Sequence, residues 1–418
     1  MKKAAITGMG IISCLGHDLD TVTKNLERGT SGIILDPERV AKGFKSPLAA
    51  KVDPVDTKAL GLSRKQLRTL CEPGLYALAA AKKALAHSGL DPKAVQNDRS
   101  GVIFGNDSTI KAGVESIDTA REYNETHYIG AGHIFRAMNS TITMNLAAHF
   151  GTQGANWTLS AACASGAHVL GQALALIRSG LQDRIIAGGA QETHWMAMAS
   201  FDALNAFSSH VNTPKQACRP FDAERNGLVP GGGGAYLIIE ELEGAKRRGA
   251  TIYATIEGYG FSSGIGKTLS EPSTQGSLTA MENALKDARK QPEEMDYINA
   301  HATGTPTGDR AEAEAIHRLF GDRVPVSSTK SMTGHECWMS GASEAIYTCL
   351  MAQQGFLAPT INFTGQEEGA HPIQVISETR YTPMDFALSN SFGFGGTNAA
   401  LVLGFPHQHI QTPKGAAS

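Results

Sequence analysis

One cysteine stands in a setting where its side chain could act as a nucleophile. Cys163 follows the short strand-like run 156–159 and comes directly before an alanine-rich helical pattern at 164–179. A cysteine at the start of a helix lies at the positive end of the helix dipole, which favours the reactive thiolate. Its neighbours are small and leave room for a substrate. A buried structural cysteine is the ordinary alternative, and this segment alone leaves both interpretations open.

Two histidines occupy similar turns later in the chain. His301 follows the apolar pair at 297–298 and precedes a hydroxyl-rich turn, and His335 ends a turn that contains Lys330. A glycine loop at 393–396 leads into a last apolar run. Taken singly, each has an ordinary explanation, because structural histidines and turn glycines are common. The short glycine patterns near residues 8–10 and 231–234 lack the helix and downstream acid of a nucleotide-binding motif.

Short strand-like runs alternate with helical patterns and would position these residues. In the first part of the chain we expect strands at 3–7, 100–104, 157–159, 184–187 and 236–240, with helices at 74–87 and 164–179. A second series gives strands at 251–257, 297–299, 324–327 and 399–403, with a helix at 277–288. This alternation predicts an α/β architecture with largely parallel sheets. The likeness of the two series predicts a duplicated fold divided into halves 1–249 and 250–418.

Composition narrows the class of protein. The chain has 418 residues, of which 41% are hydrophobic and 18% charged, and its net charge is -3. These values suit a globular protein and give no reason to expect nucleic-acid or membrane-surface binding. Six cysteines are scattered without a Cys-x-x-Cys pair, so we expect a reducing cytoplasm and no structural metal. Glycines and Asp18 interrupt the apolar start, which predicts a buried strand, and the polar tail at 406–418 is expected to be poorly ordered.

In combination, these motifs resemble a known family. The Cys163 segment, both histidine turns, the Lys330 turn and the loop Gly-Phe-Gly-Gly-Thr-Asn at 393–398 resemble the signature elements of β-ketoacyl synthases, in the same order. A further match lies at 219–227, and the resemblance extends to about Leu403. It is nearest to the bacterial type II enzymes of the thiolase superfamily. It implies a thiolase-like fold in which duplicated βα halves form a layered αβαβα arrangement.

The resemblance also implies roles for particular residues. Cys163 would be the nucleophile, with His301 and His335 as its catalytic partners. Phe394 would supply an oxyanion N–H group, together with that of Cys163, and would gate entry of the second substrate. The other implied positions are supporting charges at Lys330, Glu344, Asp309 and Glu312, pantetheine contacts at Thr303 and Thr305, and a carrier-protein contact at Arg64, Lys65 and Arg68. A solvated helix face is an equally good interpretation of the last three.

The implied reaction is a decarboxylative Claisen condensation that extends an acyl chain held on Cys163, as in fatty acid elongation. Malonyl-acyl carrier protein would supply the two new carbons, and its phosphopantetheine arm would be the only carrier group, with no metal or other cofactor. Acyl carrier protein is the implied partner. The resemblance further implies a homodimer, with a heterodimer of related subunits as an alternative.

Some positions depart from the family pattern. Ala302 replaces a common glycine, Leu228 replaces a common phenylalanine, and the run 336–342 contains the bulky residues Trp338 and Met339 where small residues prevail. The Trp338 run has some likeness to synthases of aryl-polyene and related type II polyketide pathways, which gives an alternative pathway with the same chemistry. A chain-length factor would lack the nucleophile, a thiolase would have a second catalytic cysteine near its C-terminal glycine loop, and nothing else in the sequence resembles a cysteine protease.

Overall fold

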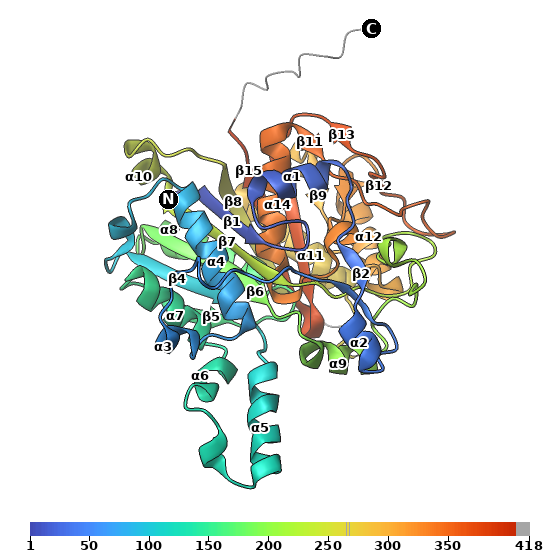
Figure 1. Cartoon of the computed structure of the whole chain (residues 1–418). Helices are drawn as coiled ribbons and strands as arrows, with labels where there is room; N and C mark the ends of the chain where they lie inside the picture. The colour runs from blue at the N-terminus through green and yellow to red at the C-terminus, as the bar shows by residue number, and fades with distance from the viewer. Residues whose placement is uncertain (265, 267, 407–418) are drawn as a thin grey trace.

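The computed structural model describes residues 1–264, 266 and 268–406. Apart from Pro406, the tail at 406–418 lies outside these residues, so the expectation about its order is not addressed. The described residues form an eleven-stranded sheet whose order is β12-β10-β9-β14-β15-β8-β1-β7-β6-β4-β5. Helices lie on both faces of this sheet (Figure 1).

The first part of the chain builds one end of the sheet. Its strands are β1 (Ala4–Ile12), β4 (Ser100–Gly105), β5 (Asn156–Leu159), β6 (Arg184–Gln191) and β7 (Gly233–Glu241). Its main helices are α4 (Glu72–His87), α7 (Thr141–Phe150) and α8 (Ser165–Arg178). Smaller elements are α1 (Leu19–Glu27), β2 (Ile33–Leu35), α2 (Pro37–Ala41), β3 (Leu48–Ala50), α3 (Arg64–Leu67), α5 (Lys111–Tyr123), α6 (His133–Ala137), α9 (Trp195–Ala203) and α10 (Leu242–Arg247).

The second part repeats this plan. Its strands are β8 (Ala254–Ser263), β9 (Tyr297–Asn299), β10 (Pro325–Ser327), β12 (Gln374–Val375), β14 (Phe386–Gly393) and β15 (Thr397–Gly404). Its helices are α11 (Thr274–Ala288), α12 (Pro306–Phe320), α13 (Lys330–Thr333) and α14 (Ser340–Gln354), and β11 (Phe356–Leu357) pairs separately with β13 (Arg380–Tyr381). The order β5-β4-β6-β7-β1 corresponds strand for strand to β10-β9-β14-β15-β8.

The pairing directions correct one expectation. β4 pairs in parallel with β5 and β6, and β9 pairs in parallel with β10 and β14. The central strands β6, β7, β1, β8, β15 and β14 are joined by antiparallel pairs. The prediction of largely parallel sheets is therefore wrong, since the sheet is mixed. The alternation of strands and helices did not reveal it, because β14 and β15 are joined by a short loop and β7 returns antiparallel after a long one.

Three apolar clusters account for the layers. On β7, Leu237 and Ile239 belong to the cluster around α8 and α14, whereas Tyr236 and Ile238 belong to the cluster under α4 and α7. On β15 the same alternation separates the α8–α14 cluster from one under α11 and α12. Because successive strand residues face opposite sides, both faces of each half-sheet are covered. The helices α8 and α14 pack on each other between the halves, which confirms the layered αβαβα fold.

Most predicted strand and helix positions are confirmed, with shifted ends. The strand expected at 251–257 starts at Ala254 and continues to Ser263. The helix expected at 277–288 starts earlier, at Thr274, because the side chain of Ser273 accepts a hydrogen bond from the N–H of Gly276 and caps it. Within the described residues, every helix is too short or too polar to span a bilayer.

Candidate active site

Cys163 lies on a tight turn between β5 and α8. Ala162, directly before it, has a φ of 46°, a left-handed conformation that a residue with a side chain adopts at a cost. Ser165 holds the turn closed, because its hydroxyl accepts from the N–H of Ala161 at 2.9 Å and donates to the carbonyl of Ala162 at 2.7 Å. Ser165 is not among the predicted site residues, because its type and position give only a weak signal of a local side-chain cap.

The loop after β14 packs directly against this turn. A side chain at Gly393 would place a Cβ atom 3.0 Å from the carbonyl oxygen of Ala161, so glycine permits the close approach. Thr397 donates from its hydroxyl to the same oxygen at 2.9 Å. Phe394, between them, is 39% exposed, and its backbone N–H acts to lower the pKa of the Cys163 thiol.

Cys163 is buried, and this changes one expectation. Burial raises the pKa of the Cys163 thiol to about 12, while the nearby Lys330 and the backbone N–H groups of Phe394 and Cys163 act in the opposite direction. The expected preference for a thiolate is therefore wrong for the substrate-free site. Loss of hydration of the charged sulfur outweighs the favourable charges and dipoles around it.

His301 follows β9, and buried carboxylates hold its loop. Glu312 accepts from the backbone N–H groups of His301 at 2.9 Å and Ala302 at 2.6 Å, and from the amide of Asn390 at 3.0 Å. Burial raises the pKa of Glu312 to about 7 despite these donors. The carboxylate thus aligns the His301 loop on the first turns of α12 and ties it to β14.

Asp309 plays the same part for the hydroxyl-rich turn. It accepts from the N–H groups of Thr303 at 3.0 Å and Gly304 at 3.1 Å, and from that of Phe221 at 2.8 Å. Burial raises its pKa to about 6. The hydroxyls of Thr303 and Thr305 lie 3.1 Å apart and both residues line the cavity described below.

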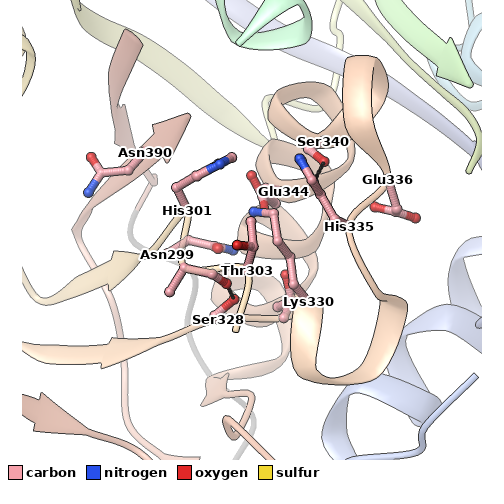
Figure 2. Close-up of polar contacts among 12 residues, drawn as sticks. Asn299, His301, Thr303, Ser328, Lys330, His335, Glu336, Ser340, Glu344 and Asn390 are labelled. Carbon is pink, nitrogen blue, oxygen red and sulfur yellow. Dashed lines mark hydrogen bonds and ion pairs between the residues drawn. The ribbon is translucent and has the colours of Figure 1, made fainter. Parts of the chain in front are cut away.

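His335 is held from both sides. Its N–H donates to the carbonyl of Val229 at 2.7 Å, and its Nδ1 lies 3.2 Å from the hydroxyl of Ser340, at the start of α14. Ser340 is not among the predicted site residues, because the turn that brings it back to the His335 ring has no recognisable sequence signature. Figure 2 shows Ser340 beside His335, with His301 on the far side of Lys330.

Lys330 and Glu344 form a fully buried ion pair near the two histidines. Burial raises the pKa of Glu344 to about 7, opposed by the Lys330 ammonium. Burial also lowers the pKa of both His301 and His335 well below the usual value, and Lys330 acts in the same direction. Both imidazoles are therefore neutral near pH 7.

The three expected catalytic side chains come together. One ligand-type atom from each of Cys163, His301 and His335 lies within 4.8 Å of the others, and the two rings meet edge to face at 5.3 Å. Across the described part of the chain, this is the one cluster spaced closely enough to hold a metal ion. The same cluster also suits metal-free chemistry, because neutral imidazoles and a protonated thiol can transfer protons and donate hydrogen bonds. The expectation that no metal is used therefore stays a prediction.

A cavity of about 310 Å³ opens over the trio. The hydroxyls of Thr303 and Thr305 form a polar side of its lining, and Phe394 also lines it. The other side is apolar and includes Met198, Phe201, Phe207, Leu228 and Cys337. Arg64, Lys65 and Arg68 are exposed on and beside α3 and are not part of this lining.

Comparisons with known proteins agree with the geometry. Residues 1–245 match the model of the β-ketoacyl synthase N-terminal domain, and residues 253–364 match that of the C-terminal domain. The chain belongs to the β-ketoacyl synthase family. It is 40% identical over 407 residues to 3-oxoacyl-[acyl-carrier-protein] synthase 1 of Escherichia coli K12, covering 96% of this chain and 99% of that one. Its membership makes it an acyl-transferring condensing enzyme.

Solved structures of the family superpose closely on this one. A β-ketoacyl synthase from Burkholderia phymatum has a TM-score of 0.92 and 35% identity, covering 97% of this chain and 100% of its own. A type II polyketide ketosynthase, solved with its acyl carrier protein and bound to a hexaketide, has a TM-score of 0.85 and 28% identity at the same coverage.

Proposed function

We propose that this chain extends acyl chains by decarboxylative condensation in fatty acid elongation. The observation that carries the proposal is the convergence of Cys163, His301 and His335 at the floor of one cavity. The curated relative at 40% identity is named a 3-oxoacyl-[acyl-carrier-protein] synthase, whereas the polyketide ketosynthase is 28% identical. These identities favour fatty acid elongation over the polyene or polyketide alternative.

The first half-reaction moves an acyl group from a carrier thioester to Cys163. Its thiol is protonated at rest, so the proton has to leave as sulfur attacks. A neutral imidazole of the trio can accept it and return it to the departing pantetheine thiolate. The backbone N–H groups of Cys163 and Phe394 support an oxyanion on the attacked carbonyl, because both favour negative charge on the neighbouring sulfur.

The second half-reaction begins when malonyl-carrier protein loses carbon dioxide. The electron pair of the broken bond becomes an enolate on the thioester oxygen. His301 and His335, both neutral, stabilise that oxygen by donating N–H hydrogen bonds. The enolate carbon then attacks the acyl thioester, and Cys163 leaves as a thiolate that takes a proton from solvent as the β-ketoacyl product forms. Because decarboxylation supplies the carbanion, the proposed chemistry needs no metal and no cofactor beyond the phosphopantetheine arm.

Supporting roles follow from the same contacts. Thr303 and Thr305 present hydroxyls on the polar side of the cavity, where a pantetheine arm would reach Cys163. Phe394 is 39% exposed and stands between two glycines, of which Gly395 has a φ of 72°, and this suits a gate for the second substrate. Arg64, Lys65 and Arg68 form an exposed basic group suited to an acidic acyl carrier protein.

We further propose a homodimer. β5 is the edge strand of the sheet, and Trp157 on it is 43% exposed. Figure 1 shows α5 and α6 projecting from the body beyond this edge. This arm exposes large apolar side chains, among them Ile117, Tyr128 and Ile134. An uncovered edge and an apolar arm favour pairing with a second subunit. Sedimentation of the purified chain tests this: a monomer would contradict the homodimer, and dimer formation only with a related chain would indicate the heterodimer.

The activity is tested by incubating the protein with acyl-carrier proteins of graded length, saturated and polyunsaturated, and then with malonyl-carrier protein. Intact mass should show acylation on Cys163 followed by a β-ketoacyl product two carbons longer. Cys163→Ser is the control and should acquire no acyl thioester. Absence of acylation with every primer, with and without a partner subunit, would contradict the proposal. A strong preference for polyunsaturated primers would instead support the polyene alternative.

A further inference from the structure

Trp338 lies behind the apolar side of the cavity. It is 95% buried, with 5% of its surface exposed, in a cluster with Cys163, Met198, Phe207, Leu228 and Cys337. The other buried members of this cluster line the cavity, whereas Trp338 does not and lies behind them. The indole therefore backs the apolar wall of the cavity that contains Cys163.

Phe201 links Trp338 to the gate. Its ring centroid lies 6.5 Å from that of Trp338 and 6.4 Å from that of Phe394. The ring centroid of Phe207 also lies 6.4 Å from that of Phe201. The rings are in the distance range of attractive aromatic pairs, so Phe201 is held between the gate and the indole.

The backbone fixes where Trp338 can lie. A Cβ on Gly166 would approach the Trp338 carbonyl oxygen to 3.1 Å, and one on Gly189 to 2.8 Å, so two glycines make room for this turn. Cys337, directly before it, has a φ of 47°. The preceding Glu336 is anchored on α14, because it accepts from the hydroxyls of Ser343 and Tyr347. In Figure 2, Glu336 points away from His301 and Lys330.

The indole itself is not fixed by a polar contact. Its Nε1 is buried and has no hydrogen-bond partner within the described residues. An unpaired buried N–H is unfavourable, so hydrogen bonding does not explain a tryptophan here. What the residue does supply is bulk: a large, flat side chain behind the apolar wall that contains Cys163.

We propose that Trp338 closes the acyl-chain subsite and sets the longest acyl group that Cys163 accepts. This inference rests on the proposed function and adds a length-determining residue to it. An acyl chain on Cys163 lies along the apolar wall that includes Met198 and Phe207, and the indole behind this wall fills the space that a longer chain would need. A hydrophobic pocket discriminates one methylene group by roughly 10- to 200-fold, so removing the indole moves the length limit upward.

The test measures the rate of Cys163 acylation by saturated acyl-carrier proteins that differ by two carbons. Trp338→Ala should accept primers at least one step longer than the wild-type limit, with a gain of about tenfold or more at the first excluded length. Short primers should change little. Trp338→Phe keeps most of the bulk and should keep a limit near the wild type, and Trp338→Leu should fall between.

A matched control is Trp195→Ala, which removes a partly buried tryptophan that faces Lys42 and belongs neither to the cavity lining nor to the apolar cluster behind it. An unchanged limit in folded Trp338→Ala or Trp338→Leu would overturn the inference, as would an equal shift in the control. If Trp338→Ala does not fold, Trp338→Leu decides. Failure of the wild-type chain to become acylated at any length would instead reject the proposed function, which separates the two outcomes.

Discussion

The two halves of the sheet have the same strand order but hold their site residues in different ways. Cys163 follows β5, and its turn is closed by one buried hydroxyl, that of Ser165, and by glycine contacts. The corresponding strand β10 leads to Lys330 and His335. Here Lys330 forms a buried ion pair with Glu344. The nucleophile needs backbone N–H groups close to its sulfur, whereas the two histidines need side chains held in a fixed orientation to donate hydrogen bonds. The same topology therefore accommodates two kinds of support at equivalent strand ends.

A second pair of positions differs more strongly. β9 leads to His301, whereas its counterpart β4 leads to Asn106, which donates to Thr109 at 3.1 Å and Asn139 at 3.3 Å. Asn106 therefore ties down the base of the α5–α6 arm. Duplication has supplied four equivalent strand ends, of which the second half uses two for histidines and the first half uses one for the nucleophile.

The largest expected effect is a loss of stability when a buried charge of the second half is removed. Lys330→Met leaves Glu344 buried and unpaired, which should lower the free energy of unfolding by about 3–5 kcal/mol. Ser165→Ala, in the first half, leaves the N–H of Ala161 unpaired and should cost about 1–3 kcal/mol. Denaturant titration measures both. The double variant Lys330→Met/Glu344→Leu should recover much of the stability lost in Lys330→Met. Equal losses in Lys330→Met and Ser165→Ala would contradict the contrast between the halves.

The next effect concerns the equivalent strand ends. His301→Ala or His335→Ala should keep substantial acylation of Cys163 but lower condensation about 100- to 1,000-fold, because one donor to the enolate is lost. Asn106→Ala, at the position that corresponds to His301, should affect condensation much less. Single-turnover assays separate the two steps. Intact condensation in either histidine variant would rule out the proposed donor role.

The pH dependence of stability gives a smaller effect. The folded-state pKa of both histidines is lowered, so the unfolded chain binds more protons and stability falls as pH decreases below about 6.5. Between pH 7.5 and 5.5 this loss should be about 1.4 kcal/mol for each histidine. The variant His301→Gln/His335→Gln should lack it. Buried acids such as Glu312 have a raised pKa and act in the opposite sense, but they are present in both proteins. If the free energy of unfolding changed with pH in the same way in the wild type and in the double variant, the rings would not be held neutral by burial.

The smallest effect should come from the exposed basic group of the first half. Charge reversal at Lys65 and Arg68 should raise the KM for acyl carrier protein several-fold with little change in kcat, because rim charges act mainly on encounter. The effect should weaken at high salt. An unchanged KM would identify these residues as a solvated helix face.

The sequence predicted the fold class and the catalytic trio because their signals are local. Cys163, His301 and His335 each follow a strand-like run and stand beside small or hydroxyl residues, and their order along the chain resembles that of a known family. The domain division at 249/250 stays a prediction, as do the roles of the individual site residues. The helix and strand positions were confirmed, because alternation and helical periodicity report burial directly.

Other properties were decided only by the tertiary structure. Strand direction depended on how β7 and β15 return across the sheet, which no local pattern encodes. The state of the Cys163 thiol depended on burial, which outweighs the helix start that the sequence does show. Ser340, Asn390 and Trp338 gained their positions from contacts between segments far apart in the chain. The sequence by itself determined which groups could react, and the packing of the two halves determined their distances, their charge states and the space left for substrate, because each of those depends on neighbours that meet only in three dimensions.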